Sequence, residues 1–299
     1  MKRIEGIIVP MITPLTEDFA LDYPGLERLV NHLVDGGVAA LFPLGTTGEG
    51  PLFSLEFQQE VNRAVCRFAA GRRPVLTGVS GASPEDTIRQ GIEAAKAGSQ
   101  GIVVAPPCYF PMTEDELVDF YTMVTTRTGL PVFVYNMPGM TKVFMKPALI
   151  ERLAQIPGIS GYKDSSNDMN SLHETLLALK NKPEFPIFVG PDSLMAENVM
   201  LGGAGGVNSG SNLYPEVYVS CWKEMRAGNL QGMMRWQEKI DAIQRIYRVF
   251  GGFNAVAMGL KSGLKVRGIC GNAMMPPLQQ PTPELEQKIR DIMKDIDEM

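Results

Sequence analysis

The sequence predicts an α/β protein in which a (β/α)₈ TIM barrel is followed by a C-terminal extension of three helices. Eight short apolar runs recur between residues 6 and 210, helical patterns separate them, and residues 229–299 continue with helical patterns alone. Near-continuous apolar runs are typical of parallel strands that are buried on both faces. Eight strand–helix repeats favour a closed barrel over an open doubly wound sheet.

The eight predicted strands are short and contain many β-branched residues. They recur about every 25 to 37 residues, which is typical of parallel strands joined by right-handed helical crossovers. The predicted strands cover residues 6–13, 38–45, 73–79, 101–107, 130–136, 159–163, 185–190 and 204–210.

Helix start signals lie between these strands. Apolar residues at helical spacing follow Asp22, which predicts a helix over 22–36. Ser54 precedes a second stripe, and Ser83 is followed by proline, a combination that is common where helices begin. Thr113 and Glu116 have the spacing of a capping box.

The predicted barrel, a catalytic domain over 1–228, continues into a helical extension over 229–299. Apolar residues keep helical spacing from Ile240 to Phe250, and a last helix is predicted from about Thr282 to the end. No linker rich in Pro, Gly or Ser separates the extension from the barrel.

Composition favours a small-molecule partner. The chain has 28 basic and 33 acidic residues, a formal net charge of −5, without the basic patches that bind nucleic acid or anionic membranes. Four widely spaced cysteines and two histidines lack zinc-site spacing, so we predict reduced thiols, no metal and a cytoplasmic location. The N-terminus resembles a first strand rather than a signal peptide, and no apolar run is long enough to span a membrane.

Catalytic residues of a barrel lie where its strands end, and Lys163 is the only lysine at such a position. Burial disfavours an ammonium ion, so the amine would tend to lose its proton, and a neutral amine can attack a carbonyl. The alternative is a structural lysine that reaches solvent or pairs with Asp164.

Two other strand ends carry polar groups. The "GTTGEG" stretch at 45–50 combines glycines with the hydroxyls of Thr46 and Thr47, which suits a carboxylate or a phosphate, although a simple glycine turn is the alternative. Tyr135 could carry protons or simply pack as an aromatic residue. Tyr109, after the fourth strand, could line the same pocket or a subunit contact. Together, a lysine, a phenol and an anchoring turn predict amine addition to a 2-oxo acid.

Four motifs in this order resemble the dihydrodipicolinate synthase and N-acetylneuraminate lyase family, and the similarity covers nearly the whole chain. The resemblance implies a (β/α)₈ barrel with a helical extension, a homotetramer, and class I aldolase chemistry on pyruvate or a related 2-oxo acid without a cofactor. The motifs are "GTTGE" at 45–49, "YNMP" at 135–138, "GYKDSS" at 161–166 and "GGVNSGSN" at 205–212.

The resemblance also implies roles for individual residues. Lys163 would form the Schiff base with C2 of the 2-oxo acid, and Tyr135 would shuttle protons. Thr46 and Thr47 would hold the substrate carboxylate, and the carbonyl of Val207 would lie near the imine. The protonated imine then accepts the electrons that a breaking carbon–carbon bond releases.

Departures from the motifs favour one branch of the family. The synthase branch carries an arginine for a second carboxylate where this chain has Met140, and a tyrosine from a neighbouring subunit where it has Cys108. Ser165, Asp192 and Ser209 lie where the lyases bind substrate hydroxyls, although ordinary loop caps are an equal alternative.

We therefore expect a lyase that cleaves a 2-keto-3-deoxy sugar acid to pyruvate and an aldehyde. Dihydrodipicolinate synthase, which condenses pyruvate with aspartate semialdehyde, and a dehydratase of keto-deoxy sugar acids are alternatives within the same chemistry. A non-catalytic 2-oxo-acid sensor and a phosphate-handling isomerase are alternatives from other classes. Retention of both Lys163 and Tyr135 argues against the sensor, and no basic residue near 205–212 supports a phosphate site.

Overall fold

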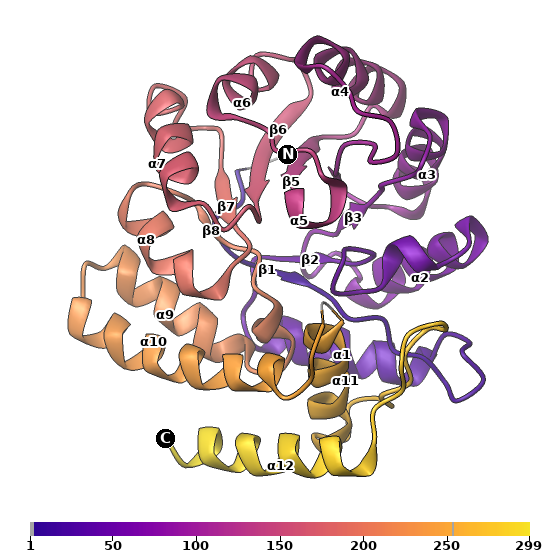
Figure 1. Cartoon of the computed structure of the whole chain (residues 1–299), viewed down its shortest axis with the longest axis vertical. Coiled ribbons are helices and arrows are strands. Elements are labelled where there is room, and N and C mark those ends of the chain that lie inside the picture. Colours follow the sequence, from indigo (N-terminus) through magenta and orange to yellow (C-terminus); the bar gives the residue numbers. More distant parts are fainter. Residues whose placement is uncertain (1–2, 253) are drawn as a thin grey trace.

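The computed structural model describes residues 3–252 and 254–299. Its centre is a parallel barrel of short strands surrounded by helices (Figure 1). The strands are β1 (Gly6–Pro10), β2 (Ala40–Phe42), β3 (Leu76–Gly78), β4 (Gly101–Val104), β5 (Val132–Asn136), β6 (Ile159–Asp164), β7 (Ile187–Val189) and β8 (Gly205–Gly206).

The strands follow one another around the barrel, as the sequence predicts. Each strand from β3 to β8 pairs in parallel with the next, and β1 pairs with both β8 and β2. A parallel bridge between Leu41 and Val75 closes the ring between β2 and β3. The predicted (β/α)₈ barrel is therefore confirmed, with several strands shorter than their apolar runs.

The closure between β1 and β8 requires glycine. A Cβ atom at Gly205 would lie 1.9 Å from the carbonyl oxygen of Gly6, and Gly205 has a φ of +155°. Any side chain at this position would force the two strands apart.

Helices cover the outside of the barrel. Around the strands lie α1 (Tyr23–Asp35), α2 (Leu55–Ala69), α3 (Pro84–Ala97), α4 (Glu114–Thr128), α6 (Pro147–Leu153), α7 (Met169–Ala178), α8 (Met195–Met200) and α9 (Pro215–Arg226). The single-turn α5 (Pro138–Thr141) instead follows β5 directly at the end of the barrel (Figure 1). Short 3₁₀ helices form at η1 (Gly50–Leu52), η2 (Asp192–Leu194) and η3 (Ser209–Asn212).

The predicted helix starts are confirmed by their hydrogen bonds. The side chain of Asp22 accepts from the Gly25 amide, and that of Ser54 accepts from the Phe57 amide. Ser83 likewise caps α3, and both halves of the capping box are present at the start of α4. Each cap satisfies an amide that the first turn of the helix leaves unpaired.

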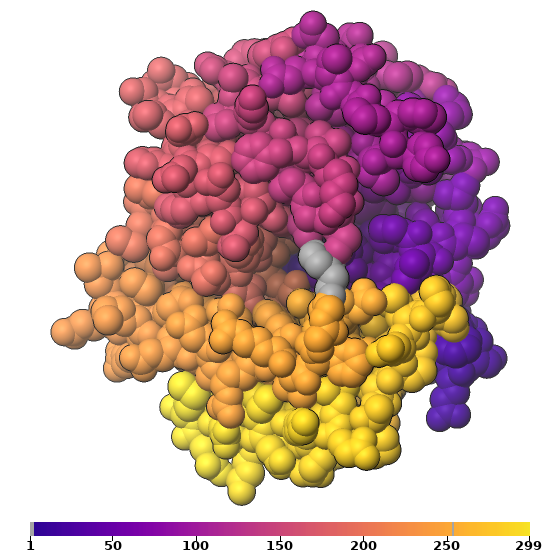
Figure 2. All heavy atoms as spheres, viewed as in Figure 1, coloured from indigo at the N-terminus to yellow at the C-terminus, as the bar shows by residue number. Residues whose placement is uncertain are grey.

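The C-terminal extension lies along one side of the barrel (Figures 1 and 2). It consists of α10 (Leu230–Ile243), η4 (Gln244–Arg248), α11 (Ala255–Val266) and α12 (Pro283–Glu298), so three α-helices follow the barrel as predicted. The helical pattern predicted up to Phe250 is wrong in one respect, because the chain changes to a 3₁₀ helix after Ile243.

Two groups of buried side chains organise the core. Alternate strand residues point into the barrel, where Phe133 and Phe188 pack with their ring centres 6.3 Å apart. The other strand faces pack against the surrounding helices, and one continuous apolar cluster extends to Ile243 and Ile289 of the extension. Tyr135 belongs to the inner group and is the penultimate residue of β5, so its side chain lies near the carboxyl end of the barrel.

Candidate active site

A cavity of about 620 Å³ opens at the carboxyl ends of the strands. It gathers eight of the nine residues predicted for the site. These are Thr46, Thr47, Tyr135, Lys163, Ser165, Asp192, Val207 and Ser209. The loops that carry them are separated by up to about half the chain, and the barrel brings them to one end.

Lys163 lies at the base of this cavity. It is the penultimate residue of β6, its side chain is 6% exposed, and the strand register places it beside Tyr135 of β5. Its Nζ lies 4.0 Å from the centre of the Tyr135 ring and 5.0 Å from that of Phe42. The structural alternative of a surface lysine is therefore wrong.

The lysine and the tyrosine shift each other's protonation. Burial lowers the pKa of Lys163, and the neighbouring Tyr135 opposes this shift only in part. Burial would raise the pKa of Tyr135, but the adjacent Lys163 ammonium and hydrogen bonds with neighbouring side chains lower it below its usual value. A depressed amine pKa increases the neutral, nucleophilic fraction near neutral pH.

Hydroxyl groups surround the phenol of Tyr135. Thr46, on the turn after β2, and Ser165, directly after β6, line the same cavity, and both side chains help to lower the pKa of the phenol. The backbone of Ser165 is fixed because its amide donates to the Asn136 carbonyl at 2.8 Å. A phenol in contact with two hydroxyls and an amine has the connections that a proton relay requires.

The turn that carries Thr46 and Thr47 is compact. Gly48 donates to the Gly45 carbonyl at 3.1 Å, and a Cβ at Gly48 would lie 2.5 Å from the Met11 carbonyl oxygen. The hydroxyl of Thr47 hydrogen-bonds to that of Ser209 at 2.9 Å, which joins the β2 turn to the β8 loop. The turn therefore presents hydroxyl groups to the cavity in a fixed arrangement.

Asp192 forms a second polar group in the cavity wall. Its Oδ2 accepts hydrogen bonds from Tyr218 at 2.9 Å and from Tyr247 at 2.8 Å. Burial raises the pKa of Asp192 to about 6, although the two tyrosine hydroxyls limit the rise. These contacts fix Oδ2, and the Asn208 side chain and the Ser209 backbone also lower the pKa of this carboxylate.

The raised pKa predicts a pH-dependent stability. Between pH 4 and 6 the folded protein holds the Asp192 proton more tightly than the unfolded chain, so raising the pH through this window lowers the free energy of unfolding. Asp192→Asn does not titrate. We expect the free energy of unfolding of the wild type to fall by about 2 to 3 kcal/mol relative to this variant between pH 4 and pH 7. Denaturant titrations of both proteins at pH 4 and pH 7 measure the free energies of unfolding. A difference between the two proteins that does not change with pH would contradict the prediction.

Tyr109 and several cavity residues depart from the prediction. Tyr109 does not line the cavity; it is 82% exposed and packs edge-on against Phe110. Tyr247 and Asn254 line the cavity but were not predicted: helical periodicity assigned Tyr247 to packing, and Asn254 lies beyond the end of that pattern at Phe250. Their position beside the barrel mouth depends on how the extension packs, which local sequence does not indicate.

The charges of the cavity are few. Among the described lining residues, Lys163 is the only basic side chain, and Glu49 and Asp192 are the acidic ones. Met140 also lines the cavity. Within residues 3–252 and 254–299, no three His, Cys, Asp or Glu side chains cluster closely enough to hold a metal ion, and no helix has the length and apolar character to cross a membrane.

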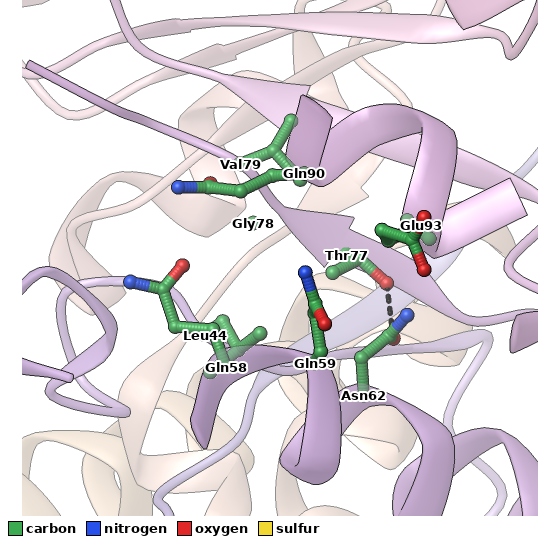
Figure 3. A pocket seen from close by; sticks show the side chains of 10 residues that line it. Leu44, Gln58, Gln59, Asn62, Thr77, Gly78, Val79, Gln90 and Glu93 are labelled. Carbon is green, nitrogen blue, oxygen red and sulfur yellow. Dashed lines mark hydrogen bonds between the residues drawn. The ribbon is translucent and has the colours of Figure 1, made fainter. Parts of the chain in front are cut away.

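A second, much smaller hollow lies between α2 and α3 beside β3 (Figure 3). Its wall includes Gln58, Gln90 and Glu93, and Thr77 donates to Asn62 at 2.6 Å. Its volume of about 10 Å³ corresponds to about one water molecule. It is too small for a substrate and does not belong to the candidate site.

Comparison with known proteins identifies the family. The sequence profile of the Dihydrodipicolinate synthetase family matches residues 3–296. The chain belongs to this family. The resemblance found in the four motifs is therefore confirmed, and the family consists of pyruvate-dependent class I lyases and aldolases.

Individual family members support the same assignment. A solved structure of dihydrodipicolinate synthase from Bacteroides thetaiotaomicron is 40% identical, has a TM-score of 0.95 and covers 99% of each chain. The prophage protein YagE of Escherichia coli K12, solved in complex with pyruvate, is 27% identical with a TM-score of 0.93 over 98% of each chain. In sequence, YagE, described as a putative 2-dehydro-3-deoxy-D-gluconate aldolase, is 33% identical over 250 residues, 82% of each protein.

Proposed function

We propose that this family member is a Schiff-base aldolase that cleaves a 2-keto-3-deoxy sugar acid to pyruvate and an aldehyde. The observation that carries the proposal is the buried Lys163 amine, with its lowered pKa, against Tyr135 in the barrel-end cavity. Thr46 and Thr47, which line the same cavity, supply donors for the substrate carboxylate.

In the proposed reaction, Lys163 first bonds covalently to the substrate and is released again at the end. The Lys163 amine adds to the C2 carbonyl, and loss of water gives a protonated imine. Tyr135 accepts the proton of the C4 hydroxyl as the C3–C4 bond breaks, so that the bonding electrons pass to the imine and an enamine forms. The aldehyde leaves, C3 takes up a proton, and water hydrolyses the imine to release pyruvate and restore the amine.

The charges of the cavity support a neutral, hydroxylated far end of the substrate. Lys163 becomes part of the imine, and no other described lining residue is basic. A second carboxylate on the substrate would therefore have no cationic side chain to pair with. Asp192, Ser209 and Tyr247 offer acceptors and donors that suit hydroxyl groups. Met140 stands where the synthase branch of the resemblance has its carboxylate-binding arginine.

Dihydrodipicolinate synthesis is a second candidate, because the 40% identical structure from Bacteroides thetaiotaomicron carries that name. A dehydratase of keto-deoxy sugar acids would use the same lysine. Mass spectrometry of the products separates all three: cleavage gives pyruvate and an aldehyde, dehydration gives the substrate less one water, and the synthase consumes aspartate semialdehyde together with pyruvate.

A substrate comparison tests the proposal directly. The enzyme is given 2-keto-3-deoxygluconate, 2-keto-3-deoxypentonate, or pyruvate with aspartate semialdehyde, and kcat/KM is measured for each. We expect one of the sugar acids to be preferred by at least about tenfold, the effect of one unpaired buried carboxylate or hydroxyl group. A preference for aspartate semialdehyde would overturn the substrate class but leave the Schiff-base chemistry intact.

The hydrogen bonds to Asp192 predict a selective change in substrate binding. Tyr247→Phe and Tyr218→Phe each remove one donor to Oδ2, and Tyr218 is fully buried outside the cavity wall. We expect both variants to raise KM for the sugar acid by about five- to tenfold, which is the effect of losing one hydrogen bond. The concentration of pyruvate that half-saturates the enzyme should stay unchanged. Equal effects on pyruvate and sugar acid would contradict this role of Asp192.

We also propose a cytoplasmic homotetramer that needs no cofactor and binds neither nucleic acid nor membrane. The exposed Tyr109 and Phe110, 82% and 72% exposed on the loop before α4, offer apolar surface for a subunit contact beside the mouth. Light scattering after size-exclusion chromatography measures the assembly, and a monomer at micromolar concentration would contradict it.

A further inference from the structure

We propose that Glu49 and Lys261 act as a positioning pair, which fixes the carboxylate-binding turn to the C-terminal extension and neutralises the charge of Glu49 beside that turn. Glu49 follows Thr46 and Thr47 in the turn after β2, and Lys261 lies in the middle of α11. The inference rests on the proposed function, because it assigns the pair a role in binding the 2-oxo acid.

The two side chains form a fully buried ion pair. Lys261 Nζ lies 2.5 Å from Glu49 Oε1, and the side chains are 0% and 2% exposed. Each partner has a second contact, since Glu49 Oε2 accepts from the Met275 amide and Lys261 donates to the Ala273 carbonyl, both at 2.7 Å. Removing one partner of such a pair leaves an uncompensated buried charge, which is strongly unfavourable.

The pair holds an unusual backbone conformation. Glu49 has a φ of +59°, in the left-handed region that residues other than glycine seldom adopt. Its amide donates to the Thr46 carbonyl at 3.1 Å, so the same residue closes the turn that carries the two threonine hydroxyls. A residue in this region stays there only when its surroundings hold it, and the contacts with Lys261 and Met275 do so.

The other end of the pair also belongs to the substrate cavity. Val256 and Ala257 of α11, one turn before Lys261, line the cavity, and Leu278 lines it three residues after Met275. Glu49 therefore joins the carboxylate-binding turn of the barrel to the part of the extension that contributes to the cavity wall.

The charge of Glu49 matters because the substrate is an anion. Glu49 lines the same cavity as Thr46 and Thr47, and Lys261 balances its charge from the side away from the cavity. The other titratable groups nearby are Cys270 beside Lys261, and four that line the cavity with Glu49: Tyr135, Lys163, Asp192 and Tyr247. Without Lys261, an ionised Glu49 would repel the substrate carboxylate, and this repulsion would weaken binding rather than the chemical steps.

Borohydride trapping with pyruvate as the probe tests this inference. Intact mass spectrometry gives the fraction of reduced adduct at each pyruvate concentration for the wild type, Lys261→Met, and the double variant Glu49→Gln/Lys261→Met. We expect Lys261→Met to raise the half-saturating pyruvate concentration by about tenfold or more, with the adduct yield at saturation unchanged. The double variant has no uncompensated charge, and the introduced glutamine can still accept the Met275 amide that holds the turn, so it should return within about threefold of the wild type.

Lys265→Met is the matched control. Lys265 lies one turn further along α11 and pairs with Glu286 at the surface, so its removal should leave half-saturation unchanged. If Lys261→Met alone does not fold, a folded double variant with near wild-type half-saturation supports the inference through charge balance.

The opposite results overturn it. A folded Lys261→Met with an unchanged half-saturating pyruvate concentration would show that the pair only contributes to packing. A double variant that does not fold, or that binds pyruvate as weakly as Lys261→Met, would lead to the same conclusion. If the wild type itself forms no adduct, the proposed function fails and the inference with it; an adduct in the wild type with unaffected variants refutes the inference alone.

Discussion

Replacing Lys163 with alanine is expected to abolish both the borohydride-trapped adduct with pyruvate and the cleavage of the sugar acid. The amine is the proposed nucleophile, and among the described cavity residues no other lysine is available to replace it. We expect kcat to fall by at least about 10³, as when an enzyme loses its covalent nucleophile. Peptide mapping of the wild-type adduct should place the added mass on the peptide that contains Lys163.

Lys180→Ala is a suitable control, because this exposed lysine follows α7 on the outside of the barrel. It should retain the adduct and the rate. Circular dichroism and thermal unfolding of both variants separate loss of chemistry from loss of structure. A folded Lys163→Ala that still cleaves at near the wild-type rate would refute the Schiff-base mechanism and make a sensor or another lysine the better hypothesis.

Tyr135→Phe is expected to lower kcat by about 10² to 10⁴, the range that a positioned general acid or base contributes. The variant keeps the ring that packs against Lys163 and removes only the hydroxyl group that Thr46 and Ser165 contact. Single-turnover trapping with pyruvate should slow as well, because proton transfer is needed to expel water during imine formation.

The control for this prediction is Tyr23→Phe. The hydroxyl of Tyr23 donates to Glu60 on the outer helices, so its loss should not change the rate. An unchanged rate in Tyr135→Phe would mean that another group carries the protons, with Thr46 and Ser165 the next residues to replace.

Much of the fold follows from local sequence patterns. The helix that begins after Ser83 follows from a cap and a proline, and the strand that carries Tyr135 and ends at Asn136 follows from a continuous apolar run. The change to a 3₁₀ helix at Gln244 was missed, because apolar spacing continues through it. Periodicity indicates that a segment is helical but does not report the precise hydrogen-bond pattern.

The candidate active site was also accessible from sequence, for a topological reason. Once eight parallel strands are predicted, all their carboxyl ends meet at one end of the barrel, so Lys163 and Tyr135 are neighbours before any coordinates are known. Resemblance to the family then narrowed the expected role of Thr46 and Thr47 to the substrate carboxylate, and it supplied a role for Val207 that spacing alone did not. Tyr109 lies on a loop that follows a strand end, as predicted, but its side chain does not line the cavity.

By itself, the sequence determined the strands, the helix starts and the strand ends that carry the reactive residues, because these depend on neighbours a few positions apart. Only the tertiary structure decided which distant groups meet. Asp192 finds its tyrosine donors on α9 and η4, and Glu49 finds Lys261 on α11. Such pairs leave no local periodicity, since their energy comes from burial after the extension has packed against the barrel.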